Sequence, residues 1–165
     1  MDGRIGDSLI HATRDEGARQ DMHDTILPKG WRRPKGYANG VAARGRIIFV
    51  AGQIGWNAEK KFETDDFSGQ VRQALANVRA VLEAGGATPA HLTRMTWYVT
   101  DKHEYLANLS AVGAAYREAV GKNFPAMTLI EVKALVEDRA RVEIEATAVV
   151  PDRPRKPARK TSRRR

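Results

Sequence analysis

The segment 124–148 constrains the fold more than any other part of the chain. It reads FPAMTLIEVKALVEDRARVEIEATA and contains two extended stretches separated by a charged turn. In the second stretch, Glu143 and Glu145 point to one face, and the opposite face carries only apolar residues: Val142, Ile144, Ala146 and Ala148. Strict alternation of this kind is typical of a strand with one buried face. We therefore expect a two-stranded hairpin that covers a core.

Two amphipathic helices precede this segment. The first has an apolar stripe with helical spacing, a cap at Thr64 or Asp65, and an end at Gly85–Gly86; its stripe is Phe67, Val71, Leu75, Val78 and Leu82. The second is expected after a cap at Asp101, with Glu104 completing a box-like cap. Its stripe is Tyr105, Leu109, Val112, Tyr116 and Val120, and Gly121 ends it.

Three further strands are expected, at 41–45 and 46–54 around a turn at Gly45, and at 92–100. Gly52 inside a strand pattern indicates a bulge or a close approach of the backbone to another group. One stripe per helix predicts an α+β fold with both helices on one face of a single sheet. The other face keeps much apolar surface, from 46–54 and 127–135, which favours an oligomer.

Charge divides the chain into three parts. Residues 151–165 contribute +7 of the net charge of +8, so residues 1–150 are nearly neutral. We expect an extension at 1–24, a domain at 25–150 and a disordered basic tail at 151–165. The near-neutral domain argues against nucleic-acid binding by the folded part, whereas the tail suits weak, salt-sensitive contact with RNA, DNA or anionic surfaces.

Several kinds of site and location are disfavoured. The chain has no cysteine, so it has no disulfide or thiolate site, and its four histidines lack ligand spacing; we expect neither a metal nor a cofactor. No apolar run reaches the ~20 residues that span a bilayer. The N-terminus is too polar and acidic for a signal peptide, so we expect a cytoplasmic protein without membrane contact.

Four strings together resemble the RidA/YjgF family, whose older names are endoribonuclease L-PSP and translation initiation inhibitor. They are GYANGVAARGRIIFVAGQIGW, WYVTD, FPAMT and VEIEATAV, and they span residues 36–150 in the family's order. Members of this family hydrolyse imines and enamines. The resemblance implies a chorismate-mutase-like two-layer sandwich that forms a trimeric barrel, with small-molecule clefts between subunits.

The resemblance also implies site residues. Tyr37 matches a tyrosine that walls the cleft, and Ala51 and Gly52 match positions whose backbone groups bind substrate. Glu143 matches the glutamate that holds or activates the attacking water. Without the family, Glu143 would be read as a solvated residue or an ion-pair partner of Arg141 or of a neighbouring strand.

Departures from the family pattern change the expected substrate. Met127 stands where the family has an arginine that grips a carboxylate, and Ala51 replaces a serine. Gly113 replaces an asparagine of some members, and Leu129 replaces a polar residue or cysteine. A thioether cannot substitute for a charged bidentate donor, so the cleft should be more apolar and suit a ligand uncharged at that end.

The resulting hypothesis is hydrolytic deamination of a small imine or enamine with a non-standard substrate. Two alternatives stay open. One is a non-catalytic trimer that binds a metabolite or acts like a chaperone. The other is RNA binding or cleavage that depends on the tail.

Overall fold

The computed structural model describes residues 23–152 of the 165. The expected extension and basic tail lie almost entirely outside these residues, although Asp24 already belongs to the first strand. The elements are β1 (Asp24–Ile26), β2 (Gly40–Ala42), β3 (Arg46–Ile54), α1 (Phe67–Ala84), a 3-10 turn η1 (Pro89–His91), β4 (Leu92–Val99), α2 (Lys102–Ala107), α3 (Leu109–Ala119), β5 (Ala126–Glu131) and β6 (Val142–Val150).

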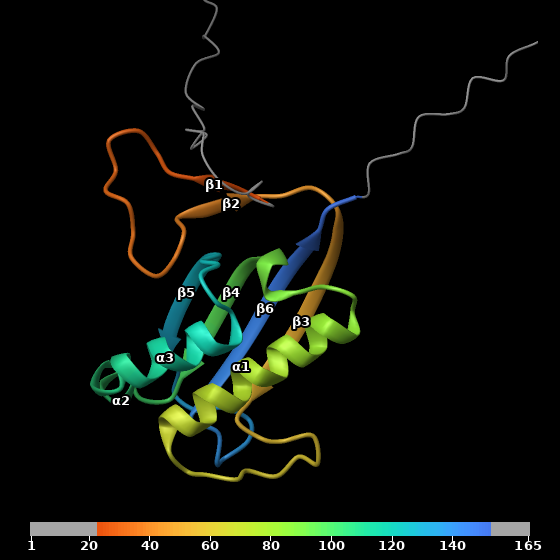
Figure 1. Cartoon of the computed structure of the whole chain (residues 1–165). Helices are drawn as coiled ribbons and strands as arrows, with labels where there is room; N and C mark the ends of the chain where they lie inside the picture. The colour runs from red at the N-terminus through yellow and green to blue at the C-terminus, as the bar shows by residue number, and fades with distance from the viewer. Residues whose placement is uncertain (1–22, 153–165) are drawn as a thin grey trace, which may run out of the picture.

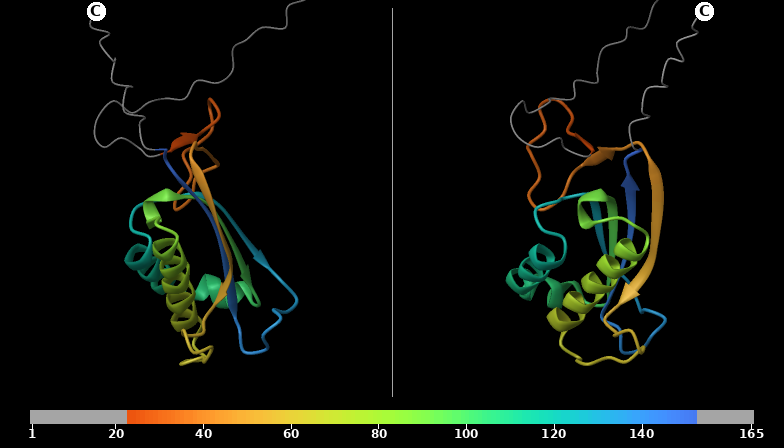
Figure 2. Two further views of the ribbon diagram at one scale, coloured as in Figure 1. Left: turned by 90° about the vertical axis from the view of Figure 1, so that its right-hand side faces the viewer. Right: turned by 45° about the vertical axis from the view of Figure 1, so that its right-hand side comes forward.

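The main sheet has the order β3-β6-β4-β5 and is mixed, because β4 and β5 run parallel while the other pairs are antiparallel. Both long helices lie on one side of it (Figures 1 and 2). The predicted α+β sandwich with one-sided helices is therefore confirmed. No helix in the described part of the chain is long and apolar enough to cross a bilayer.

The prediction of a hairpin at 124–148 is wrong. Its two strands, β5 and β6, do not pair with each other, because β4 lies between them. The helices α2 and α3 carry the chain from β4 to a parallel neighbour, β5, as crossover connections do. The loop 132–141 then returns the chain so that β6 pairs on both edges, with β3 and with β4.

The second expected hairpin, around Gly45, is also wrong. β2 pairs with β1 in a separate two-stranded sheet, and β3 pairs with β6. Gly45 has φ 145°, and a Cβ built on it would lie 2.0 Å from the carbonyl oxygen of Val150. The turn at Gly45 therefore directs β3 along β6 and away from β2.

The helix α1 forms over the predicted stripe, whose five residues are all buried. Its cap is Asp66, one residue beyond the predicted choice, and Oδ2 of Asp66 accepts from the backbone N of Gly69 at 2.7 Å. The hydrogen bonds from Ser68 and Gly69 lower the pKa of the Asp66 carboxyl. The two predicted caps make different contacts, since Thr64 accepts from the Asp66 backbone and Asp65 pairs with Arg139.

The second predicted helix is two helices that meet at Asn108. Asp101 caps α2 as predicted, accepting from the backbone N atoms of His103 and Glu104. The Glu104 side chain does not complete the box; it pairs with Arg141 at 2.7 Å. The break at Asn108 rotates the apolar stripe, so Leu109 is 51% exposed while Val112 and Tyr116 remain buried.

The core lies between the helices and the helix-facing side of the sheet. The apolar face of β6 belongs to it as predicted, with Val142 and Ile144 fully buried. Trp97 of β4 is also core, at 2% exposure. These residues bury the sheet's inner face, and no layer formed by residues 23–152 covers the outer face (Figure 2).

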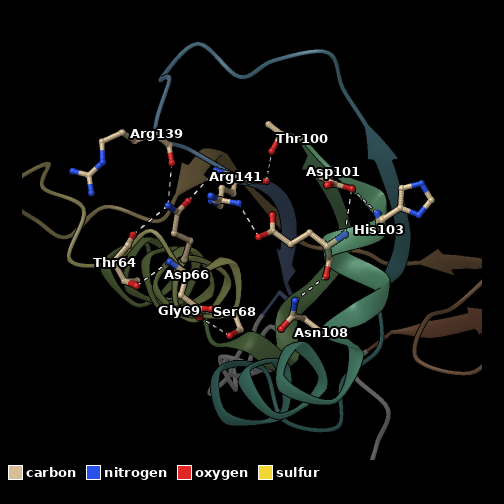
Figure 3. Close-up of polar contacts among 12 residues, drawn as sticks. Thr64, Asp66, Ser68, Gly69, Thr100, Asp101, His103, Asn108, Arg139 and Arg141 are labelled. Atoms are coloured by element: carbon tan, nitrogen blue, oxygen red, sulfur yellow. Dashed lines mark hydrogen bonds and ion pairs between the residues drawn. The ribbon is translucent and has the colours of Figure 1, made fainter.

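A buried amide joins α1 to the loop before β6. Gln70 is fully buried; its Nε2 donates to the carbonyls of Thr64 (3.2 Å) and Arg139 (3.0 Å), and its Oε1 accepts from the Arg141 backbone N at 2.9 Å. The carbonyl of Arg141 accepts from the Thr100 backbone N, and the Arg141 side chain bonds Glu104 (Figure 3). These contacts fix the backbone two residues before Glu143.

Candidate functional site

A β-bulge interrupts β3 beside β6. Val50 pairs with Ala146 and Gln53 with Ile144, so Ala51 and Gly52 together oppose one residue of β6. The Nε2 atom of Gln53 donates to the carbonyls of Ala51 and Gly52, at 3.1 and 3.2 Å. The sequence prediction of a bulge at Gly52 is confirmed.

Glu143 lies against this bulge. It is partly buried on the sheet face away from the helices, because its neighbours Val142 and Ile144 point into the core. A Cβ built on Gly52 would lie 1.8 Å from Oε1 of Glu143 and 2.6 Å from its Cδ. The carboxylate thus fills the space that a side chain at position 52 would need. The predicted close approach of the Gly52 backbone to another group is therefore confirmed too.

Glu143 forms no ion pair with the described residues. The partner that a purely structural role would use, Arg141, bonds Glu104 at 2.7 Å. The next carboxylate on the same face, Glu145, lies 4.0 Å from Arg94. A carboxylate that sits beside open backbone without a cation is available to a ligand or a water molecule.

Sequence reasoning missed Tyr98 as a member of this group. Tyr98 pairs with Glu143 across β4 and β6, and Thr96 pairs with Glu145. Desolvation and then the negative charge of Glu145 raise the pKa of Tyr98 above its ordinary value, which favours the neutral phenol. The sequence pattern that could have identified Tyr98 was the alternation in β4. It places Thr96 and Tyr98 on one face of the strand, and Met95 and Trp97 on the other.

Thr96 adds an unusual polar atom. Its side chain is 3% exposed, and its Oγ1 has no hydrogen-bond partner among the described residues. Buried hydroxyls are normally paired. The Thr96 hydroxyl is therefore a donor on the outer face without a partner among residues 23–152.

Met127 and Leu129 occupy the other side of the sheet. Met127 pairs with Met95, and Leu129 with Trp97, which are core residues. Both side chains are partly buried and pack against the core cluster. They lie on β5, which is separated from Glu143 of β6 by β4.

Tyr37 and Gly113 lie away from Glu143. Tyr37 sits in a bend, not in a strand, at 44% exposure. Its neighbour Ala38 donates to the Pro125 carbonyl at 2.9 Å and bridges to Ala126, which brings Tyr37 to the start of β5. Gly113 belongs to α3, where a Cβ would meet the Arg117 guanidinium at 3.3 Å.

One chain therefore brings together only part of the predicted site. Ala51, Gly52 and Glu143 form one group at the β3–β6 pair, which we call the bulge group. Tyr37 and Met127 mark the opposite edge of the sheet, at β5. No set of three or more potential ligand side chains among residues 23–152 could hold a metal ion.

Comparisons with known proteins confirm the resemblance. The family model described as Endoribonuclease L-PSP matches residues 32–150. The 2-iminobutanoate/2-iminopropanoate deaminase of Salmonella typhimurium is 34% identical over 113 residues, 68% of this chain and 86% of the relative. The structure of YyfB, a Rid-family protein of Yersinia pestis, has a TM-score of 0.69 at 33% identity and covers 78% of this chain and 99% of that one. The YjgF gene product of Escherichia coli gives a TM-score of 0.54 at 32% identity, covering 76% and 98%.

Substitution of Gly52 tests the contact with Glu143. Gly52→Ala places a methyl group in the space of the carboxylate, and we expect it to lower the free energy of unfolding by about 1–3 kcal/mol. In a Glu143→Ala background the same change should cost less than about 0.5 kcal/mol, because the colliding side chain is gone. Urea denaturation of the four proteins measures this coupling. Equal costs in both backgrounds would show that Glu143 does not occupy the space above Gly52.

Proposed function

The chain belongs to the endoribonuclease L-PSP family, also called RidA/YjgF, and on that premise we propose that it hydrolyses the C=N bond of a small imine, or of the enamine that tautomerises to it. The curated relatives of similar sequence include imine deaminases. The observation that carries the proposal is the Glu143 carboxylate, which lies against the bulge at Gly52 without an ion-pair partner in the described chain.

The proposed chemistry needs a base, a water molecule and a hold on the substrate nitrogen. Glu143 takes a proton from water as the water oxygen bonds to the imine carbon, and the nitrogen takes up the electron pair of the C=N bond. The same carboxyl then delivers its proton to nitrogen, which gives the carbinolamine. The C–N bond then breaks as the hydroxyl loses its proton to nitrogen, and a carbonyl compound and ammonia are released. Backbone groups of Ala51 and Gly52 orient the substrate, and a carboxylate in this role contributes about 10²–10⁴ in rate.

We further propose that the working unit is a homotrimer with clefts between copies. Three large apolar side chains on the outer sheet face support assembly: Ile47, Phe49 and Ile130 are 55%, 77% and 45% exposed. The bulge group and the β5 edge lie on different parts of one chain. A second copy on the outer face could bring its β5 edge, with Tyr37 and Met127, to the bulge group of the first.

The substrate class follows from the apolar residues at the β5 edge. Met127 and Leu129 offer no charge to a substrate carboxylate, and both pack partly against the core. We therefore propose an imine that is uncharged or aromatic at the end that would meet Met127. An always-charged bidentate donor is the group that a carboxylate-bearing imine would need there.

Replacement of Glu143 tests the catalytic role. Glu143→Gln keeps the shape of the side chain but removes the base, and we expect kcat for imine hydrolysis to fall by about 10²–10⁴-fold. Ammonia release from imines generated in situ by an amine oxidase is the measurement. Glu145→Gln, on the same face of the same strand, is the matched control and should lose less than about tenfold. Equal activity of wild type and Glu143→Gln would remove Glu143 from the mechanism.

Replacement of Met127 tests the substrate class. Wild type should hydrolyse uncharged imines with a higher kcat/KM than imines bearing a carboxylate. Met127→Arg should reverse this order, with a gain of at least about tenfold on the carboxylate-bearing imine, since the guanidinium binds the carboxylate through two hydrogen bonds. Met127→Lys adds the charge without the planar fork and should gain less. A wild type that already prefers carboxylates contradicts the proposed substrate class but leaves hydrolysis itself intact.

Light scattering tests the assembly. The chain of 18.3 kDa should give about three times this mass, because pairing of outer faces removes the exposed apolar side chains from water. Phe49→Asp should yield monomers, since it would bury an unpaired charge. Val136→Asp is the control: Val136 is exposed and apolar but lies in the loop 132–141, outside the strands of the sheet, and the trimer of this variant should persist. A stable wild-type monomer would exclude the trimer.

A further inference from the structure

The near-neutral charge of the folded part hides a strongly uneven distribution. Between Asp24 and Glu59 the chain contains no acidic residue and six cations: Lys29, Arg32, Arg33, Lys35, Arg44 and Arg46. Residues 25–58 therefore carry +6 and the tail +7, while all other residues together carry −5. The expectation that the folded part is no polyanion binder rested on its net charge, which this local excess of cations makes a poor guide.

Four of these cations belong to one connection, residues 28–35, which we call the basic loop. It leaves β1 and returns to β2, and the pairing of Ile26 with Gly40 closes its base. Lys29, Arg32, Arg33 and Lys35 are all exposed, and none pairs with a carboxylate among residues 23–152. In Figure 1 the loop extends beyond the helices and the main sheet.

The basic loop is held at defined points. The backbone N of Trp31 donates to the Pro28 carbonyl at 3.1 Å, and Gly30 and Gly36 adopt φ of 85° and 82°, which favour glycine. Beyond the loop, the Ala38 backbone N bonds Pro125. Trp31 stands 63% exposed between the cations, so its ring is presented to solvent beside a row of positive charge.

The basic tail begins at the same end of the molecule. A Cβ on Gly45 would lie 2.9 Å from Cα of Pro151, so the tail leaves next to Arg44 and Arg46. Figures 1 and 2 place this point and the two-stranded β1–β2 sheet at one end, opposite the loop that follows β3. The tail therefore begins at the end of the molecule that carries the basic loop.

We propose that the basic loop is a binding site for single-stranded nucleic acid, with Trp31 as a stacking platform. Arginine and lysine neutralise phosphates, and arginine, which predominates at this end, also binds them bidentately. An exposed tryptophan stacks on an unpaired base without regard to sequence. Duplex bases are already stacked, which favours a single strand.

A membrane surface is the less favoured partner. Interfacial segments bury a broad apolar face beneath their cations. Between residues 28 and 36 this chain has one large apolar side chain, Trp31, and four cations. That ratio suits stacking and phosphate contact better than insertion.

Fluorescence anisotropy of a labelled 20-nucleotide single-stranded RNA of mixed sequence tests the proposal on the full chain. Trp31→Leu should weaken binding about tenfold, whereas Trp31→Phe, which keeps an aromatic ring, should stay within about threefold of wild type. Arg32→Gln/Arg33→Gln should lower the slope of log K against log salt by about 1.4, or 0.7 per lost phosphate contact. Lys60→Gln/Lys61→Gln removes the same charge from the loop after β3 and should change affinity less than about twofold.

Four further measurements decide the outcome. A duplex of the same sequence should bind more weakly, and a chain ending at Pro151 should still show the losses caused by the loop variants. RNA affinity that depends on the tail but not on Trp31, Arg32 or Arg33 would overturn the proposal. So would loop-dependent binding to vesicles of phosphatidylserine and phosphatidylcholine without loop-dependent binding to RNA. Melting curves of the variants confirm that the exposed substitutions leave the fold intact.

Discussion

The buried side-chain amide of Gln70 holds together the parts of the molecule on which the site depends. It joins the first turn of α1 to the loop that precedes β6, and all three of its contacts are with backbone groups. A Cβ on Gly55 would come within 2.5 Å of the Gln70 Cβ, so the end of β3 also packs directly on this side chain. Both strands of the bulge group are therefore fixed from one point. An apolar residue at position 70 would leave two carbonyls and one N–H without partners in a dry core, where each costs about 1–3 kcal/mol.

Local patterns predicted the elements well and their pairing poorly. The stripe beginning at Phe67 and the alternation through Glu143 and Glu145 depend on period alone, and both formed where expected. The partner of a strand depends on contacts far away in sequence, so adjacency in the chain wrongly suggested two hairpins. The break at Asn108 was similarly hidden, because five apolar residues at helical spacing look continuous across a change of axis.

The residues of the candidate site show the same contrast: local patterns predicted some of them, and long-range pairing decided the others. Gly52 could be predicted because a glycine within a strand usually marks a bulge or a close contact, and Glu143 followed from its alternating strand. Which face Met127 occupies could not be predicted, since it depends on the parallel register that sets it beside Met95. The charge of the domain was misjudged for a different reason. The net charge of residues 1–150 is nearly zero, and this sum concealed residues 25–58, a 34-residue stretch without a single carboxylate. Net charge describes solubility better than it describes recognition.

The central position of β6 has a consequence for how the chain folds. β6 is the last strand in the sequence, yet it separates β3 from β4. Until it is in place, β3 has no neighbour in the main sheet, and β4 and β5 form only a two-stranded parallel ribbon. During synthesis, the other strands of the sheet therefore keep unpaired edges until β6 has been made. The β3–β6 contact spans about a hundred residues, and such long-range closure slows folding and exposes unpaired strands to association. A chain that ended before Val142 would lack the strand that makes the sheet continuous.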